Sequence, residues 1–461
     1  MDMNDESRRD DATREALAAW PWRAGMLFYR TGIDAFFAAG GLRRLKKKYR
    51  VGIDERMGIF GPDVPRDALW VHSVSVGEVQ SAMSLLEAAK ADLSLPCILS
   101  TVTTTGRTMA ENLTAHVADR FIYNPWDTRT FVRRALDTLT PRAYVAMETE
   151  RWPTMLYELH RRGIPAFLVN GRLSDKSAGR LRRTRTFWRG VLCCFDRLMV
   201  RFDSDRENFL SLGVPEEKIF VTGDCKIDAM FSRRRNIDAS KWERLRGGDS
   251  GRPLFLAAST HEGEEEIVLR AFRTVRQKYP RARLIIAPRH PERARPVATT
   301  ALSFGRVALL SDLSDSVSSS PSSSGASEMP DIVVVDKIGV LFDLCSIADA
   351  AFVGGRLVSR GGQNLMEPAL FGIQVTHGPD MSNFPDAGRM DALGAARVVH
   401  NAPQLAKAWL ASVNDAARLR VRQACKAWFD TVGGASDRSW RIVREYLPNR
   451  EMNDPVSGRS K

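Results

Sequence analysis

The chain has 461 residues, of which 44% are hydrophobic and 27% charged; one hydrophobic core rarely organises so long a chain, so we expect two domains. The formal net charge of +13 favours an anionic partner such as a phosphorylated substrate, an acidic lipid or a nucleic acid. Six cysteines without a CxxC pair or a secretory signal predict reduced thiols in the cytosol and argue against structural zinc.

Residues 1–48 begin with a polar, charged stretch and continue into aromatic and apolar residues, which lead into a basic run at 43–50. Charged residues interrupt the apolar part, so it falls short of the roughly 20 apolar residues that span a bilayer. We predict an interfacial helix whose apolar side chains enter the acyl layer while the basic run meets anionic head groups. The apolar candidates are Leu27, Phe28, Phe36 and Phe37. The alternative is an amphipathic helix packed on its own domain.

Residues 49–230 alternate short apolar runs with helical patterns. The expected strands are 68–76, 96–103, 143–148, 165–171 and 197–202, and helical patterns lie at 78–90, 105–113, 151–163 and 204–214. This alternation predicts right-handed βαβ crossovers and a parallel sheet with both faces covered. We therefore expect a Rossmann-like, doubly wound N-terminal domain over these residues.

A charged, strand-poor stretch at 231–252 is expected to be a linker. Strand patterns restart at 253–259, 283–289, 331–337, 350–355 and 373–378. They predict a second Rossmann-like domain over 253–425, with a serine-rich surface loop at 311–330. Residues 426–461 are expected to form a C-terminal helix and tail. The predicted fold class is α/β, with two doubly wound domains facing a central cleft.

The loops after the strands should carry the chemistry, because open α/β sheets bind ligands at the carboxyl ends of their strands. Glu78 follows Ser75 and Gly77 at the first turn of a predicted helix. The helix dipole there favours an ionised carboxylate, which a general base requires. A carboxylate that only complements the helix N-terminus is the alternative.

Glu148 and Glu150 lie at the end of the strand 143–148. Residues spaced by one position point to opposite sides of an extended segment, so these two carboxylates are not expected to form an acid/base dyad. One is expected to brace Arg172 or another loop and the other to touch the acceptor. The sequence does not assign which.

In the second half, Ser259 and Thr260 end a strand just before an acidic helix start. Their hydroxyls either cap that helix or donate to a ligand phosphate or carboxylate. Arg289 follows another strand, where it either grips an anion in a bidentate pair or forms a salt bridge between loops. The acidic run 262–266 does not predict a metal site, because neighbouring carboxylates on one helix point in different directions.

The stretch "GGRLVSRGGQNLMEPAL" resembles a phosphate-binding turn between a strand and a helix. Gly355 closes the strand, and Gly362 and Asn364 precede the helix. Glycines let a backbone approach a ligand closely, and free N–H groups at a helix N-terminus bind phosphate.

The motifs "ETE.WP", "STHEGEEE", "PRHPER" and "GG.N..EPA" occur in series, and with them the chain resembles the Kdo transferase family from about residue 49 to about residue 384. The resemblance implies a GT-B fold that transfers 3-deoxy-D-manno-octulosonic acid (Kdo) from CMP-Kdo to a lipid A precursor without a metal or other cofactor. It implies that the domain at 49–230 binds the acceptor and that the domain at 253–425 binds CMP-Kdo. It implies that Glu78 is the catalytic base and that the acceptor-binding or loop-bracing residues are Ser75, Gly77, Glu148, Glu150 and Arg172. The donor-binding residues are then Ser259, Thr260, Arg289, Gly355, Gly362, Asn364 and Glu367, with Glu367 accepting from sugar hydroxyls. Gln363 stands where the family usually has histidine, so a titrating role there is in doubt.

We therefore expect an inverting displacement at the cytoplasmic face of the inner membrane, on an anionic lipid surface and without nucleic acid. The alternatives are another GT-B nucleotide-sugar transferase, a nucleic-acid-binding protein or a non-catalytic scaffold. A nucleic-acid-binding protein should interleave aromatic and basic residues on an exposed face. Outside residues 1–50 the basic residues are instead dispersed.

Overall fold

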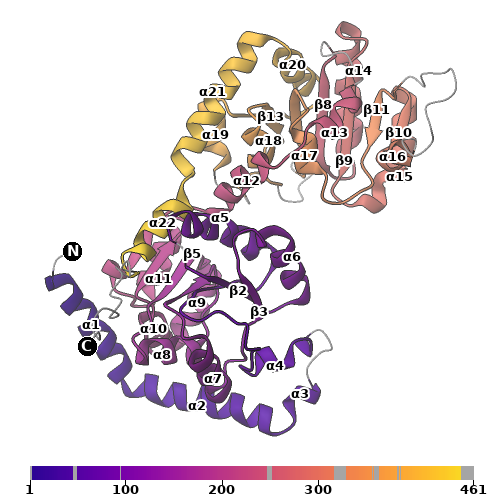
Figure 1. Cartoon of the computed structure of the whole chain (residues 1–461). Helices are drawn as coiled ribbons and strands as arrows, with labels where there is room; N and C mark the ends of the chain where they lie inside the picture. The colour runs from indigo at the N-terminus through magenta and orange to yellow at the C-terminus, as the bar shows by residue number, and fades with distance from the viewer. Residues whose placement is uncertain are drawn as a thin grey trace, which may run out of the picture. The chain divides into compact units, whose positions relative to one another are not determined.

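The computed structural model describes residues 3–44, 49–93, 95–246, 252–315, 329–355, 357, 363–381, 384 and 386–447. Its contacts divide the chain into two compact units (Figure 1), one formed by Met1–Ala229 with Val432–Lys461 and the other by Met230–Thr431. In the described residues each unit holds a seven-stranded, all-parallel sheet. The predicted α/β class with two doubly wound domains is confirmed.

The first sheet has the order β3-β2-β1-β4-β5-β6-β7. Its strands are β1 (Leu69–His72), β2 (Cys97–Thr101), β3 (Arg120–Tyr123), β4 (Ala143–Met147), β5 (Ala166–Gly171), β6 (Arg197–Val200) and β7 (Ile219–Val221). Its helices are α4 (Ile53–Arg56), α5 (Val76–Asp92), α6 (Thr104–Thr114), α7 (Arg129–Leu139), α8 (Pro153–Arg161), α9 (Asp175–Leu181), α10 (Arg185–Cys193), α11 (Asp203–Ser211) and α22 (Ala435–Arg444). Strand order reverses between β1 and β4, so the loops after these two buried strands form the topological switch point where such sheets bind ligands.

The second sheet has the order β10-β11-β9-β8-β12-β13-β14 and its switch point between β8 and β12. Its strands are β8 (Leu254–Thr260), β9 (Arg283–Pro288), β10 (Val307–Leu309), β11 (Ile332–Val334), β12 (Ala350–Val353), β13 (Gln374–His377) and β14 (Ala396–Val398). Its helices are α13 (Ser240–Glu243), α14 (Glu264–Lys278), α15 (Ala294–Ala301), α16 (Leu310–Asp315), α17 (Leu341–Cys345), α18 (Met366–Leu370), α19 (Ala387–Leu393), α20 (Ala402–Ser412) and α21 (Asp415–Val432). Helix α12 (Cys225–Arg235) carries the chain from the first unit into the second.

The strands that sequence patterns did not predict are the edge strands of both sheets: β3 and β7 in the first, β10 and β14 in the second. Each has three or four residues, some of them partly exposed. Edge strands pair on one side alone, so they do not need the continuous apolar run that marks a central strand.

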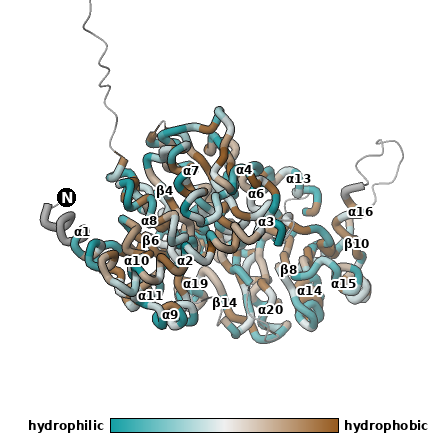
Figure 2. The backbone as a smooth tube through the Cα atoms, turned by 90° about the horizontal axis from the view of Figure 1, so that it is seen from below, coloured by the Kyte–Doolittle hydropathy of each residue, from teal (hydrophilic) through white to brown (hydrophobic). Residues whose placement is uncertain are grey.

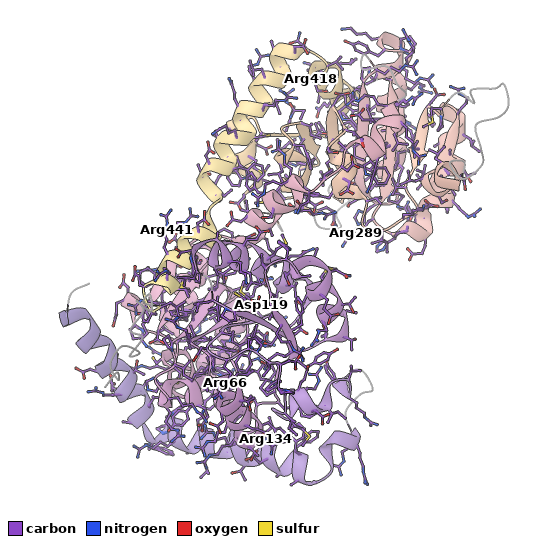
Figure 3. All side chains as sticks on the ribbon, viewed as in Figure 1. Arg66, Asp119, Arg134, Arg289, Arg418 and Arg441 are labelled. Atoms are coloured by element: carbon purple, nitrogen blue, oxygen red, sulfur yellow. The ribbon has the colours of Figure 1, made fainter. Side chains whose placement is uncertain are left out.

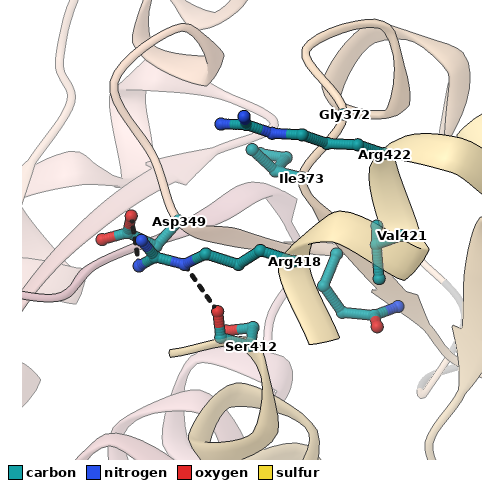
Figure 4. A pocket seen from close by; sticks show the side chains of 8 residues that line it. Asp349, Gly372, Ile373, Ser412, Arg418, Val421 and Arg422 are labelled. Atoms are coloured by element: carbon teal, nitrogen blue, oxygen red, sulfur yellow. Dashed lines mark hydrogen bonds and ion pairs between the residues drawn. The ribbon is translucent and has the colours of Figure 1, made fainter. Parts of the chain in front are cut away.

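The expected linker, residues 231–252, belongs to the second unit. Leu245 is buried there, and Arg246 donates to Asp349 at 2.9 Å. Arg418 of α21 binds the same carboxylate at 2.8 Å and donates to the Ser412 carbonyl at 2.9 Å (Figure 4). The cavity beside this ion-pair network measures about 40 Å³, which suits a water molecule and not a sugar nucleotide.

The expected C-terminal segment 426–461 is divided between the units. Helix α21 ends at Val432, and the chain then returns to the first unit as α22. Trp440 of α22 is buried and donates to Asp92 at the end of α5, 3.0 Å away. The serine-rich loop expected at 311–330 lies largely outside the described residues.

Helices α1 (Met3–Ala18), α2 (Trp20–Ala38) and α3 (Gly41–Arg44) precede the first sheet. In Figure 2 the described part of α1 is mostly in the hydrophilic colour. Trp22 of α2 is buried, and the ring centre of Phe37, a half-buried residue, lies 4.9 Å from that of Trp126. Leu27 and Phe28 are exposed as expected. Across the described helices, none combines the length and apolar character needed to cross a membrane.

Candidate active site

Glu78 lies in the first turn of α5, at the switch point of the first sheet. Its side chain is only 8% exposed, and Oε2 accepts a hydrogen bond of 2.5 Å from the backbone N–H of Val74. Burial raises the pKa of Glu78 to about 7, and the negative charges of Glu150 and Glu148 raise it further. The hydrogen bond from the Val74 N–H and the positive charge of Lys226 lower the same pKa. The helix dipole favours the ionised carboxylate as expected, but burial outweighs it and leaves the pKa above its ordinary value. A pKa near 7 is the value that suits a general base at neutral pH.

The residues before Glu78 in the first turn of α5 leave the helix start uncovered. Ser75, at the N-cap position of α5, is exposed, and its side chain does not cap the helix. A Cβ added to Gly77 would meet no atom within 4 Å. A substrate hydroxyl therefore has room to approach the start of this helix.

Glu148 and Glu150 have separate partners, as their spacing predicted. Glu148 is buried, forms an ion pair with Lys226 Nζ at 2.7 Å and accepts a hydrogen bond from Ser81 Oγ at 3.2 Å. Its backbone is held at a φ of +52°, a strained conformation for a residue with a side chain. Glu150 instead accepts from Trp152 Nε1 at 2.9 Å. The two carboxylates therefore act on different neighbours.

Arg172 is not braced by the side chain of Glu148. Its guanidinium is exposed, and within the described part of the chain no carboxylate forms an ion pair with it. The link that exists is through the backbone, where the Arg172 N–H donates to the Glu148 carbonyl at 3.1 Å.

Sequence reasoning missed two residues beside these carboxylates. Lys226 lies in the first turn of α12, which follows β7, an edge strand that the pattern did not reveal. His72 is fully buried at the end of β1 and lies 2.9 Å from Ser100 Oγ and 3.2 Å from Trp152 Nε1. The signal that could have identified His72 from the sequence is its position at the end of a predicted strand.

The second unit contains a cavity of about 240 Å³ at the carboxyl edge of its sheet. Four predicted donor-site residues line it together: Ser259, Arg289, Asn364 and Glu367. Gln363 also lines the cavity. Arg289 follows β9 and is exposed there (Figure 3). Residues more than 100 positions apart thus converge as the strand-end argument predicted.

Thr260 and Gly355 are not available to a ligand in the predicted way. Thr260 is fully buried, and its hydroxyl donates to Glu265 at 3.0 Å. The Gly355 N–H donates to Glu264 Oε2 at 2.8 Å, and the His261 N–H donates to the same carboxylate at 2.9 Å. These groups brace the loops around the cavity. Gly362, the remaining donor-site prediction, lies outside the described residues.

Arg233 of α12 is a cavity residue that the sequence reading left in the expected linker. Its guanidinium lies 4.2 Å from the ring centre of Phe342 and pairs with Asp343 at 3.5 Å. Burial raises the pKa of Glu367, while Arg233, a hydrogen bond with Asn364 and Arg289 lower it. The cavity therefore presents two guanidinium groups, which suit anionic groups of a ligand, next to a carboxylate that suits hydroxyls.

In the described residues, no group of three or more His, Cys, Asp or Glu side chains is placed to hold a metal ion. The acidic run after β8 contributes Glu264 to loop bracing and Glu265 to an ion pair with Arg293 at 2.7 Å.

The family model described as 3-deoxy-D-manno-octulosonic-acid transferase (kdotransferase) matches residues 51–229. A 3-deoxy-D-manno-octulosonic acid transferase from Haemophilus influenzae is 31% identical, over 88% of this chain and 94% of its own length. The chain belongs to the Kdo transferase family. A Kdo transferase from Bordetella pertussis is 30% identical, over 89% of this chain and 94% of its own. The family is one of glycosyltransferases, so the predicted enzyme class is confirmed.

Solved structures agree with the fold of this Kdo transferase family member. A putative UDP-N-acetylglucosamine 2-epimerase from Listeria monocytogenes has a TM-score of 0.57 at 13% identity, covering 83% of this chain and 97% of its own. A glycosyltransferase from Rickettsia africae has a TM-score of 0.52 at 11% identity, covering 83% and 99%. At these identities the likeness concerns the fold alone.

Proposed function

We propose that the chain transfers Kdo from CMP-Kdo to a hydroxyl of a lipid A precursor, lipid IVA, in lipopolysaccharide biosynthesis, with Glu78 as general base. The observation that carries the proposal is the setting of Glu78: a buried carboxylate with a pKa of about 7 at a sheet switch point, reached through an open helix start. A base with this pKa is deprotonated in a large fraction of molecules at neutral pH and still holds an accepted proton.

In the proposed reaction, Glu78 takes the proton of the acceptor hydroxyl as its oxygen attacks the anomeric carbon of Kdo. The bond from that carbon to the CMP phosphate oxygen breaks, and CMP leaves with the bonding electrons as an anion. The attack comes from the face opposite the leaving group, so configuration inverts. Arg289 and Arg233 line the cavity assigned to the donor and oppose its negative charge. Electrostatic stabilisation of the leaving phosphate is the largest expected contribution.

We propose that this transfer needs no metal ion. CMP departs without needing a proton, and the two guanidinium groups of the donor cavity supply positive charge for its phosphate. Incubation with EDTA should leave the rate unchanged, with a known magnesium-dependent glycosyltransferase as the positive control. A rate that falls with EDTA and returns with added Mg²⁺ contradicts this part of the proposal.

The acceptor and the charge of the chain support a place at an anionic membrane surface, at the cytoplasmic face of the inner membrane. Trp20, Leu27 and Phe28 on α2 are exposed to 76%, 69% and 82%. Isolated exposed apolar residues are common, but three large ones on one helix are a pattern of interfacial helices. We propose no nucleic-acid partner.

A donor comparison tests the proposed function. The full chain is incubated with lipid IVA and with CMP-Kdo, CMP-sialic acid or UDP-N-acetylglucosamine, and the lipid is analysed by mass spectrometry. The proposal expects the mass of one or more Kdo residues to be added with CMP-Kdo alone. Transfer from another donor, with none from CMP-Kdo, refutes the substrate assignment and favours a different GT-B reaction.

A further inference from the structure

His72 is the last residue of β1, directly before the loop that leads to Glu78. Its side chain is fully buried, and the proposed reaction gives it no step. Nδ1 lies 2.9 Å from Ser100 Oγ on β2, and Nε2 lies 3.2 Å from Trp152 Nε1 at the start of α8. A buried histidine with specific partners on two other elements is placed to hold them in a fixed arrangement.

The partners of His72 determine which of its nitrogens carries the proton. An indole nitrogen donates and does not accept, so the Trp152 N–H donates to Nε2, and Nε2 carries no proton. The proton of the neutral ring then lies on Nδ1, which donates to Ser100 Oγ. A doubly protonated ring would turn an N–H toward the indole N–H. These contacts therefore suit the neutral form of His72.

Trp152 shares its indole N–H between two acceptors. It donates to Glu150 Oε2 at 2.9 Å as well as to His72 Nε2 at 3.2 Å. The Trp152 and His72 rings also meet edge to face, with ring centres 6.3 Å apart, and His72 stacks on Tyr144 of β4 at 6.4 Å. Because His72 is fixed on both sides, it holds the indole in the position from which Trp152 binds Glu150.

Glu150 and Glu78 follow β4 and β1, the two adjacent strands of the switch point. The Glu150 side chain is only 13% exposed, so water screens its charge weakly. Among the described charged side chains that act on Glu78, Glu150 and Glu148 raise its pKa and Lys226 lowers it. If the Glu150 carboxylate turned toward solvent, one of the two charges that raise the pKa of Glu78 would act less strongly.

We propose that His72 is a positioning residue, which holds the Trp152 indole and through it the Glu150 carboxylate at the switch point that carries Glu78. This role requires neither contact with a substrate nor a proton on Nε2. The inference rests on the proposed function, because Glu150 can affect the reaction in this way only if Glu78 is the base. It adds to that function a buried residue of β1 that helps to set the pH range in which the base works.

The test compares the dependence of kcat/KM on pH, between about pH 5 and pH 9, for Kdo transfer by the full chain. His72→Leu removes one acceptor of the shared N–H, and Trp152→Phe removes the N–H but keeps a ring. In both variants the rise of kcat/KM should move to lower pH by about half a unit. His72→Gln offers an acceptor to the indole again and should restore the wild-type midpoint. Trp152→Phe tests the same link if the leucine variant does not fold.

A double variant tests whether His72 acts through Glu150. Glu150→Gln should itself move the midpoint to lower pH, and adding His72→Leu should then cause no further shift. A lower kcat with an unmoved midpoint in both His72→Leu and Trp152→Phe overturns the proposal, because a structural defect reduces active enzyme without changing its pH profile. A further shift in the double variant also overturns it. Absence of Kdo transfer by the wild type refutes the proposed function instead.

A second measurement needs no Kdo transfer. The difference in unfolding free energy between the wild type and Glu78→Gln depends on pH through the pKa of Glu78. This difference should change over a narrower pH range in the His72→Leu or Trp152→Phe background, because the pKa of Glu78 then lies closer to its ordinary value. An unchanged range in both backgrounds overturns the positioning role, whatever reaction the chain performs.

Discussion

Glu78→Gln distinguishes a general base from a helix cap, because the two roles predict opposite changes in stability. Burial raises the pKa of Glu78 to about 7 from an ordinary value of 4.5. Between these values the folded state binds more protons than the unfolded state, so the free energy of unfolding falls as pH rises through this window. Each pH unit corresponds to about 1.36 kcal/mol, so keeping the carboxylate ionised in the fold costs up to about 3 kcal/mol above pH 7. Below pH 4.5 this cost is absent.

Glutamine removes the charge and keeps an oxygen that can accept from the Val74 N–H. We therefore expect Glu78→Gln to be more stable than the wild type at pH 8 by about 1–3 kcal/mol, and to match it near pH 4.5. Scanning calorimetry of the full chain should show the transition of the first unit rise by about 2–4 °C per kcal/mol. Glu87→Gln, on the same helix and paired with His116 at 3.5 Å, is the control and should change little. A Glu78→Gln variant less stable than the wild type at pH 8 would show that the carboxylate is a cap, and it would refute this reasoning.

Further predictions concern activity. For the wild type, kcat/KM should rise about tenfold between pH 6 and pH 8, as a base with a pKa of about 7 loses its proton. Lys226→Gln removes a charge that lowers the pKa of Glu78, so the same rise should move to higher pH; an unmoved profile would count against their coupling. Arg233→Gln should raise KM for CMP-Kdo by roughly 10-fold or more through loss of a charged hydrogen bond, and an unchanged KM would remove it from the donor site. Gly354→Ala places a Cβ 2.5 Å from a buried carboxylate oxygen and should impair donor binding, as measured by calorimetric titration with CMP, whereas Gly388→Ala has open space and should be neutral.

The sequence was sufficient for the central part of the fold. Buried parallel strands need continuous apolar runs, so each of the central strands left a pattern, while β10 and β14 at the edges of the second sheet did not. The sequence also did not reveal that α22 returns to the first unit. The apolar face of α22 indicates that the helix packs against a protein core, but it does not indicate which of the two units provides that core. The same holds for α2, because its sequence does not show that the ring of Phe37 packs against Trp126.

The candidate site was predictable as a set of loops but not as a set of contacts. Ser259 and Arg289 line one cavity because both follow strands of one sheet. Thr260 and Gly355 also lie at strand ends, but the Thr260 hydroxyl and the Gly355 N–H donate hydrogen bonds to buried carboxylates of α14 and not to a ligand. The pKa of Glu78 has the same origin, since burial depends on the tertiary structure while the helix dipole is visible locally.

The central claim is that Glu78 is the base of Kdo transfer. Initial rates of transfer from CMP-Kdo to lipid IVA, read by mass spectrometry of the lipid, should be compared for the wild type, Glu78→Gln and Glu87→Gln at pH 8. The account predicts a loss of about 10²–10⁴-fold in Glu78→Gln, the usual contribution of general base catalysis, with Glu87→Gln close to the wild type. A Glu78→Gln variant that transfers Kdo at the wild-type rate would contradict the account and place the base elsewhere.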